Sequence, residues 1–246
     1  MPVFMLDERL VFPPVELAIE GGILAVGGDL SVERLLLAYR EGIFPWYSDD
    51  EPIIWWSPDP RFVLFPEELK VSRSMRKVME RGIFRITLDT AFGEVIRHCG
   101  EMKRPGQRGT WITDEMREAY TELHRRGYAH SVEAWSGERL AGGLYGVSLG
   151  SCFFGESMFA HESNALKAAL IVLVGALRAR GFTLIDSQVY TQHMESMGAR
   201  EIPREEYIAL LKKCLEKESL TGSWSGLVSD SSVVNAVDEG CGRGNR

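Results

Sequence analysis

The sequence predicts a mixed α/β fold, of the α+β kind, in which a small N-terminal domain precedes a larger mixed-sheet domain. Three observations support this prediction. The first 60 residues are rich in Gly, Pro and Trp, whereas the following stretch alternates strand-like and helix-like segments. Three consecutive strand-like runs then form a meander, which is followed by a long apolar helix and one more strand. A meander that leads into a strand–helix–strand return indicates a mixed sheet.

The N-terminal domain, residues 1–60, is predicted to contain one good helix over residues 32–41. Ser31 can cap the start of this helix and Gly42 can end it. The prolines that follow forbid long regular elements, so the rest of the domain is expected to be irregular, with a linker over residues 57–61. These prolines are Pro45, Pro52, Pro58 and Pro60.

The second domain is predicted over residues 61–219. Its first half should contain strand 61–65, a helix that opens at Ser72, strand 84–88, a helix that ends near Gly100, and helix 113–126. The last helix has the clearest pattern, because apolar residues recur at i, i+3, i+4 and i+7 between an acidic start and a basic end.

The second half of this domain carries the meander. We expect strands 130–135, 140–148 and 152–158, then helix 163–180, strand 183–189 and helix 203–217. From about Leu220 the composition shifts to Ser, Gly, Asp and Asn, which predicts a disordered tail over residues 220–246.

Bulk properties narrow the class of protein. The most apolar run, residues 168–177, is far shorter than the roughly 20 residues that a membrane span needs. The four cysteines show no regular spacing and the chain opens without a signal-peptide pattern, so we expect a cytoplasmic protein with reduced thiols. The five histidines lack ligand spacing, so no metal is expected. Neither GxxxxGK nor GxGxxG appears, and no cofactor is expected. No coiled-coil pattern is present, and a monomer is expected.

The charge distribution leaves room for a nucleic-acid partner on an acidic chain. The net charge is -7, but residues 61–126 hold 14 basic and 10 acidic side chains, whereas residues 1–60 hold 3 and 11. Basic residues in the middle of the chain could therefore form one local phosphate-facing patch. Its core is predicted at Arg73, Arg76, Lys77 and Arg81. An ordinary solvated surface is an equally simple interpretation of these residues.

Two apolar runs, residues 153–159 and 184–189, each contain polar side chains. Burial of a polar group costs free energy unless the group is paired or used. Because side chains alternate along a strand, Glu156 should share a face with Met158, and Asp186 should share one with Gln188. The two pairs could line one pocket.

At this point the chain resembles the leucyl/phenylalanyl-tRNA–protein transferases, which move an amino acid from tRNA to the N-terminus of a protein. The resemblance covers roughly residues 12–215. It depends on the order and spacing of the two apolar runs and of four further motifs, GGDL from Gly27, GIFPW from Gly42, WWSPDPR from Trp55 and GTWIT from Gly109.

The resemblance implies a fold, an activity and partners. It implies that the second domain is like the acyl-CoA N-acyltransferases. It implies that Leu, Phe and, less well, Met pass from aminoacyl-tRNA to proteins that begin with Arg or Lys, which marks those proteins for degradation by the N-end rule pathway. No nucleophilic residue, metal or nucleotide is required, because the ester is already activated and positioning alone can supply about 7–11 kcal/mol of the barrier.

Site residues follow from the same motifs. The resemblance implies that Asp186 and Gln188 form a relay that accepts a proton from the attacking amine, and Glu156 is a candidate partner for an amine. The alternative for Asp186 is the end of a strand, for Gln188 a surface position, and for Glu156 an edge carboxylate in solvent. Phe153 and Met158 suit an aminoacyl side-chain pocket, although such residues are more often plain core.

Two tryptophans are candidates for stacking on the terminal adenosine of tRNA, namely Trp46 and Trp111. A lone tryptophan is usually core, and only the surrounding motifs single these two out. The sequence departs from the family pattern at Ala160, where a serine is expected, and at Leu166, where a small residue is expected. Both departures affect donor or acceptor preference more than the reaction.

Two other functions remain open on the sequence alone. Residues 155–159 begin like the G-x-S-x-G nucleophile elbow of a serine hydrolase, with Ser157, Asp186 and His193 in hydrolase order, but Phe159 replaces the closing glycine. A non-catalytic tRNA-binding module would keep the basic patch and Trp111 without needing Asp186 and Gln188.

Overall fold

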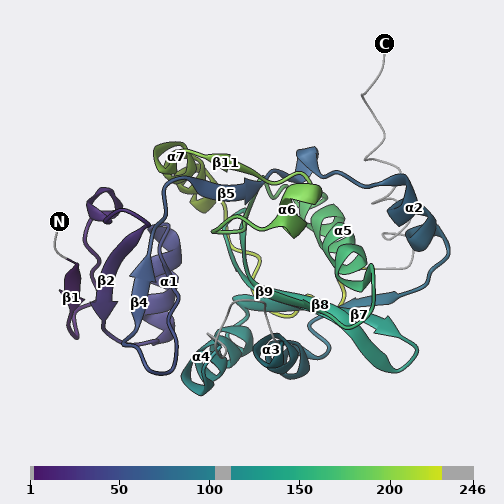
Figure 1. Cartoon of the computed structure of the whole chain (residues 1–246), viewed down its shortest axis with the longest axis horizontal. Helices are drawn as coiled ribbons and strands as arrows, with labels where there is room; N and C mark the ends of the chain where they lie inside the picture. Colours follow the sequence, from purple (N-terminus) through teal and green to yellow (C-terminus); the bar gives the residue numbers. More distant parts are fainter. Residues whose placement is uncertain (1–2, 103–111, 229–246) are drawn as a thin grey trace, which may run out of the picture.

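A computed structural model of the chain describes residues 3–102 and 112–228 and contains two sheets. The first sheet belongs to the N-terminal part and has the strand order β1-β2-β4-β3 (Figure 1). Its strands are short: β1 Phe4–Leu6, β2 Ile23–Gly27, β3 Phe44–Pro45 and β4 Ile54–Trp56. The prolines predicted to forbid long elements lie in or beside β3 and β4. The sequence predicted an irregular domain here and missed this sheet, because two- to five-residue strands carry too little periodicity to be recognised.

Helix α1, Val32–Arg40, packs beside this sheet and is capped as predicted. The Ser31 hydroxyl accepts a hydrogen bond from the Arg34 N–H at 3.4 Å. Gly42 ends the helix with φ +76°, and a Cβ there would lie 2.5 Å from Ile208. The 3-10 turn Val15–Leu17 precedes α1.

The second sheet has seven strands in the order β11-β5-β10-β9-β8-β7-β6. All of its pairs are antiparallel except β9 with β10, which are parallel. The strands are β5 Arg61–Leu64, β6 Arg85–Leu88, β7 Ala129–Ser136, β8 Arg139–Leu149, β9 Cys152–Ala160, β10 Leu184–Asp186 and β11 Arg200–Ile202. The predicted class, a small N-terminal part followed by a mixed-sheet α/β domain, is confirmed.

Helices cover both faces of the large sheet (Figure 1). Alternate side chains of β8 separate two hydrophobic clusters: Tyr145 belongs to the cluster under α3 and α4, and Leu144 belongs to the cluster under α5. The helices of this domain are α2 Arg73–Glu80, α3 Phe92–Glu101, α4 Asp114–Arg125, α5 Ala165–Arg178, α6 Gln192–Ser196 and α7 Arg204–Leu215, with a 3-10 turn at Pro66–Glu68. Across the described residues no helix is long and apolar enough to cross a membrane.

Two predicted boundaries are wrong. The strand expected over residues 183–189 ends at Asp186, because Gln188 takes a left-handed backbone conformation with φ +62°. The tail expected to be disordered from Leu220 is packed as far as residue 228, and Trp224 is only 1% exposed. The prediction of disorder depended on the polar composition of this segment and gave no weight to its one tryptophan. Residues 229–246 of the predicted tail lie outside the described residues.

Candidate active site

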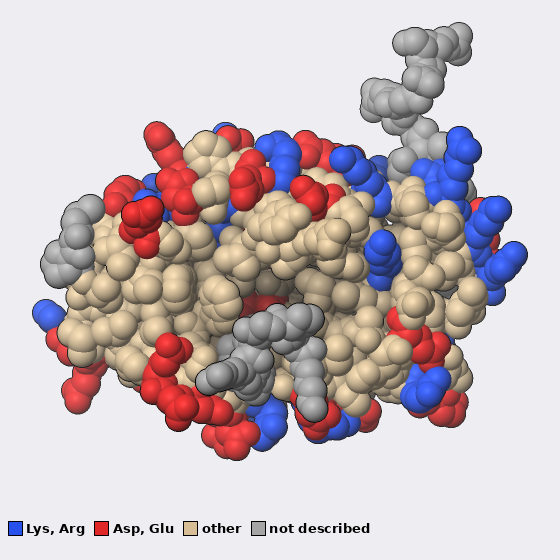
Figure 2. Space-filling model, in the orientation of Figure 1, with Lys and Arg blue, Asp and Glu red and all other residues tan. Residues whose placement is uncertain are grey.

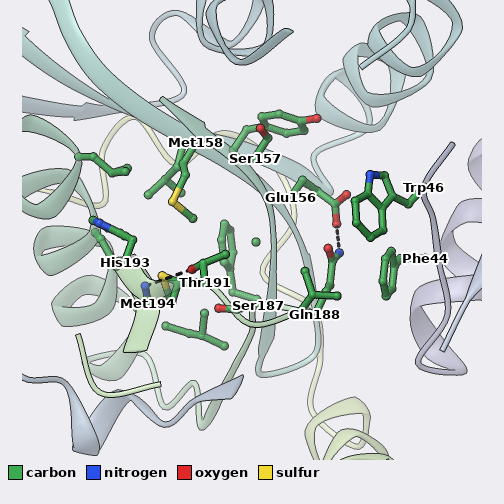
Figure 3. A pocket seen from close by; sticks show the side chains of 18 of the residues that line it. Phe44, Trp46, Glu156, Ser157, Met158, Ser187, Gln188, Thr191, His193 and Met194 are labelled. Atoms are coloured by element: carbon green, nitrogen blue, oxygen red, sulfur yellow. Dashed lines mark hydrogen bonds between the residues drawn. The ribbon is translucent and has the colours of Figure 1, made fainter. Parts of the chain in front are cut away.

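A cavity of about 390 Å³ opens where the parallel strands β9 and β10 separate (Figure 3). The two strands pair from Leu184 opposite Cys152 to Asp186 opposite Phe154. Beyond that point β9 continues, whereas β10 has ended. Residues 155–158 line one side of the opening, residues 187–189 line the other, and residues 44–46 of the N-terminal part complete it. The N-terminal part and the large-sheet domain therefore both contribute to the cavity wall.

Glu156 projects into this opening because β9 bulges there. Tyr145 of β8 pairs with Ser157 and Gly146 pairs with Gly155, so Glu156 is the extra residue between the two pairs. A bulge bends a strand and redirects a side chain, and bulges are common beside active sites. Glu156 and Met158 both line the cavity, as does Ser157 between them.

The Glu156 carboxylate is buried among neutral donors. It accepts a hydrogen bond from the Tyr120 hydroxyl at 2.9 Å and one from Gln188 Nε2 at 2.8 Å. The Tyr120 hydroxyl is in turn hydrogen-bonded to the hydroxyl of Tyr39 in α1. Burial raises the pKa of Glu156 to about 7, although hydrogen bonds from the two tyrosines and Gln188 act in the opposite direction. This carboxyl can therefore gain or lose a proton near neutral pH.

Gln188 is held in place by its own backbone. Its N–H donates to Asp186 Oδ1 at 2.8 Å, and its carbonyl accepts from the Phe62 N–H at 3.3 Å. A left-handed non-glycine residue is strained, and such residues cluster at functional sites. Because the side-chain NH₂ group donates to Glu156, the amide oxygen of Gln188 is left to accept a further hydrogen bond. Figure 3 shows the two side chains side by side at one end of the cavity, next to Trp46 and Phe44.

Asp186 does not share a face with Gln188, contrary to the prediction from strand alternation. The strand ends between them, and the Asp186 side chain is fully buried against Arg61, which donates from Nε at 2.9 Å and from a terminal nitrogen at 2.7 Å. The Tyr207 hydroxyl also donates to Asp186, at 2.8 Å. Asp186 thus contacts the backbone of Gln188, whereas Glu156 contacts its side-chain amide.

The opposite end of the cavity is apolar. Phe153 and Met158, the candidates for an aminoacyl side-chain pocket, both line the cavity. Met158 and His193 lie together at this end in Figure 3. Further apolar side chains complete the wall: Leu144, Leu166, Leu170, Ile185 and Met194. Leu166, one of the two departures from the family pattern, therefore lies in the wall, while Ala160 lies at the exposed end of β9.

The hydrolase arrangement is not formed. Ser157 and His193 both line the cavity, but the Asp186 carboxylate is engaged by Arg61, Tyr207 and the Gln188 backbone. His193 Nε2 is buried, and no hydrogen-bond partner lies within reach among the described residues. Its pKa is lowered by burial and by the charge of Lys167. Among the described residues, no hydrogen bond joins His193 to the Asp186 carboxylate, whereas the triad requires a carboxylate that orients the histidine.

The predicted donor-binding residues fall into three groups. Trp46 lines the cavity and is 37% exposed, so its ring is available to a ligand. Trp111 lies outside the described residues. The basic residues of α2 lie on the far side of α5, which α2 contacts, with Arg73, Lys77 and Arg81 exposed and Arg76 half-buried. Figure 2 shows Lys and Arg gathered over this helix, and a hollow with acidic atoms at its bottom near the centre of the same face.

Sequence reasoning missed four residues that build the site: Tyr39, Arg61, Tyr120 and Tyr207. Tyr39 lies on α1 and Tyr120 on α4, and both rings are buried. Their hydroxyls nevertheless meet at Glu156, which no periodicity reveals. Arg61 offered one usable signal, because a charged residue opens an otherwise apolar strand and would need a buried partner.

Comparison with known proteins adds the family. The model of the leucyl/phenylalanyl-tRNA protein transferase family matches residues 63–212, and the model of that family's N-terminal domain matches residues 28–59. Two proteins with the name leucyl/phenylalanyl-tRNA--protein transferase are similar over 92% of this chain. The one from Syntrophus aciditrophicus is 61% identical over 94% of its own length, and the one from Myxococcus xanthus is 52% identical over 97%.

Among solved structures, the chain is similar to L-PGS from Bacillus licheniformis. The TM-score is 0.38 and the identity 12%, over 70% of this chain and 57% of that one. A likeness at this level carries no argument about function.

Proposed function

This chain belongs to the leucyl/phenylalanyl-tRNA–protein transferase family and moves an amino acid from aminoacyl-tRNA to the N-terminus of a protein, and we propose that Glu156 and Gln188 are the groups that carry out the transfer. The observation behind the proposal is the 2.8 Å hydrogen bond from Gln188 Nε2 to Glu156 Oε1 at the wall of the cavity. With this bond made, the amide oxygen of Gln188 and the carboxyl group of Glu156 both face the cavity.

The proposed reaction forms a C–N bond and breaks the ester C–O bond of the tRNA ribose. The α-amino group of the acceptor attacks as the neutral amine and donates to the Gln188 amide oxygen. The proton that the nitrogen loses as the C–N bond forms passes to Glu156. An α-amino group has an ordinary pKa of roughly 7.7–8, so a substantial fraction of it is neutral near that pH, and the pKa of Glu156 is raised to about 7, which suits a base at neutral pH. The protonated Glu156 then returns a proton to the departing ribose oxygen, which restores the carboxylate.

Asp186 acts in this proposal as a positioning residue rather than as part of the relay. Its carboxylate holds the Gln188 N–H and is itself fixed by Arg61 and Tyr207. The left-handed turn at Gln188 depends on that support, because a free chain would rarely adopt it. Loss of Asp186 should therefore misplace the Gln188 amide.

The donor occupies the apolar end of the cavity in this proposal. Phe153 and Met158 contact the Leu, Phe or Met side chain, and Trp46 stacks on the terminal adenosine. Trp111 is a second candidate for stacking, on the sequence alone. The tRNA body lies over α2, where Arg73, Arg76, Lys77 and Arg81 neutralise phosphates. The exposed ring of Trp46 and the basic face of α2 support this orientation.

The acceptor is proposed to be a protein that begins with Arg or Lys. Four carboxylates gather beside the segment that follows Trp46, at the start of α4 and in the turn after β3, and they would attract a basic N-terminus. They are Asp49, Glu51, Asp114 and Glu115. The product would be a degradation signal of the N-end rule pathway, made in the cytoplasm by a monomeric enzyme.

Transfer from radiolabelled leucyl-tRNA to peptides that differ only in their first residue tests this function. Peptides that begin with Arg or Lys should be labelled, whereas peptides that begin with Ala or Glu should not. Equal labelling of all four would refute the acceptor assignment, and no labelling of any would refute transfer itself.

A further inference from the structure

We propose that Trp224, in the C-terminal segment formed by residues 219–228, positions Phe153 and thereby sets the size of the apolar end of the cavity. This inference rests on the proposed function for the meaning of that cavity. The sequence assigned Trp224 to a disordered tail, yet its side chain is only 1% exposed. A large aromatic residue that is buried in a polar segment requires a structural explanation.

Trp224 is docked on a platform that the sheet provides. Its ring stacks on the His130 ring with centroids 3.6 Å apart and an interplanar angle of 4°. Its backbone N–H donates to Asp89 Oδ2 at 2.7 Å, and its indole Nε1 donates to the Leu220 carbonyl at 3.1 Å. Both N–H groups of the residue are therefore satisfied, which fixes the ring in position and in orientation.

The platform is itself anchored at two points. Asp89 Oδ2 lies 2.9 Å from His130 Nδ1, and Asp89 Oδ1 accepts from the Ser131 N–H at 2.9 Å. Asp89 follows strand β6 with a left-handed backbone of φ +55°. One carboxylate thus holds the β7 strand, the His130 ring and the C-terminal segment together.

Phe153 lies between this platform and strand β8. Its ring centroid is 6.0 Å from that of Trp224. A Cβ atom on Gly146 of β8 would lie 2.6 Å from Phe153 Cζ, so the ring occupies space that any other residue at Gly146 would fill. Phe153 also lines the cavity. Trp224 therefore prevents the ring from moving back and widening the cavity.

Removal of the indole should enlarge the space open to the donor side chain. In Trp224→Ala, the Phe153 ring can retreat toward the vacated volume, and a larger aminoacyl group then fits. One methylene of pocket space changes selectivity by roughly 10–200-fold. We expect the preference for 2-naphthylalanine relative to leucine to rise about tenfold, at the low end of that range. Trp224→Phe keeps a ring behind Phe153 and should shift the ratio less.

Two measurements test this effect. The first is transfer to an Arg-peptide from tRNA charged chemically with leucine or with 2-naphthylalanine, with kcat and KM determined separately for each donor. The second is the calorimetric Kd of non-reactive adenosine amides of the same two amino acids, which needs no turnover. Ile86→Ala is the matched control, because Ile86 is buried in the same hydrophobic cluster but does not line the cavity; it should leave both ratios unchanged.

A shift of both ratios in Trp224→Ala, smaller in Trp224→Phe and absent in Ile86→Ala, supports the proposal. An unchanged Kd ratio in a folded Trp224→Ala protein overturns it, as does an equal loss of activity with both donors. If Trp224→Ala does not fold, an unchanged ratio in Trp224→Phe overturns the proposal. If the wild type binds both amides but transfers neither amino acid, the proposed function fails while the binding ratio still decides the role of Trp224.

Discussion

The guanidinium of Arg61 donates to both oxygens of Asp186, at 2.9 and 2.7 Å, and neither side chain is exposed by more than 1%. Arg61 also donates to the Gly42 carbonyl at 3.2 Å and lies 4.8 Å from the centroid of the Phe44 ring. A single buried ion pair therefore joins the N-terminal part of the cavity wall to the turn that carries Gln188.

Asp186→Ala should lower the free energy of unfolding by about 3–5 kcal/mol, because it leaves the Arg61 charge buried without its partner. Turnover should fall in the same variant through the displaced Gln188 amide. Urea unfolding measures the first effect. The double variant Arg61→Leu with Asp186→Leu should lose less stability than the sum of the losses in the Arg61→Leu and Asp186→Leu single variants, because the double variant buries no unpaired charge. Wild-type stability in Asp186→Ala would contradict this interpretation of the pair.

Glu156→Gln should lower kcat/KM by roughly 10²–10⁴-fold, the usual yield of a positioned acid–base group. In the wild type, kcat/KM should rise with pH through about 7, where the Glu156 carboxyl loses its proton. This limb should be absent from the residual activity of the variant. Ser157→Ala, at the next position of β9, is the control and should stay within a few-fold of wild type. A complete loss of transfer in Ser157→Ala would revive the hydrolase-like alternative.

Glu156→Gln should also make the protein more stable at alkaline pH. The pKa of Glu156 is raised from its ordinary 4.5 to about 7 in the folded chain. The contribution of the protonated Glu156 carboxyl to the free energy of unfolding is therefore fully present below pH 4.5 and is lost as the pH rises through 7. This difference in pKa corresponds to about 3 kcal/mol of the free energy of unfolding, at roughly 1.4 kcal/mol per pKa unit. Urea unfolding at pH 5 and pH 8 should show a wild type that weakens more than the variant. Parallel pH dependence of the two proteins would contradict the shifted pKa.

Reversal of Arg76 and Lys77 to Glu should weaken binding of charged tRNA without changing which amino acid is preferred. Three or four neutralised phosphates predict a slope of log K against log salt of about -2 to -3, and loss of two contacts should reduce its magnitude by about 1.4. The control reverses Lys212 and Lys213 on α7, which carry the same two positive charges and are both exposed. A slope that falls equally in both variants would remove α2 from the tRNA site.

Trp46→Ala should weaken binding of a minimal adenosine ester donor by about 10- to 100-fold, since stacking of one base on an aromatic ring is worth about 1–3 kcal/mol. The ring is already 37% exposed, so stability should change little. Tyr190→Ala is the control, because Tyr190 is 52% exposed and packs on Phe62 rather than on the cavity wall. Calorimetric titration compares the three proteins. Normal binding by the Trp46→Ala protein would show that the terminal adenosine stacks on another residue.

The sequence predicted those parts of the fold that depend on local chemistry. Helix α4 begins after the Thr113 cap and covers the segment that the apolar periodicity predicted. Both the cap and the periodicity are read from residues only a few positions apart. The small N-terminal sheet was missed, because its strands depend on pairing between segments far apart in the chain. Local patterns contain no information about such pairing.

The candidate site shows the same division. The residue types at positions 156, 186 and 188 pointed to the cavity, but strand alternation predicted the wrong partner for Gln188. Alternation assumes regular backbone, and the backbone is irregular at both Glu156 and Gln188. The tyrosines that contact Glu156 come from α1 and α4, so only the tertiary structure brings them together.

The extra residue in β9 joins two properties at one position. Without Glu156, the β8–β9 ladder would pass without interruption from the pair Tyr145–Ser157 to the pair Gly146–Gly155. The same residue therefore interrupts the strand and supplies the carboxylate at the interruption. Deletion of this one position would remove the acid and restore the regular ladder together.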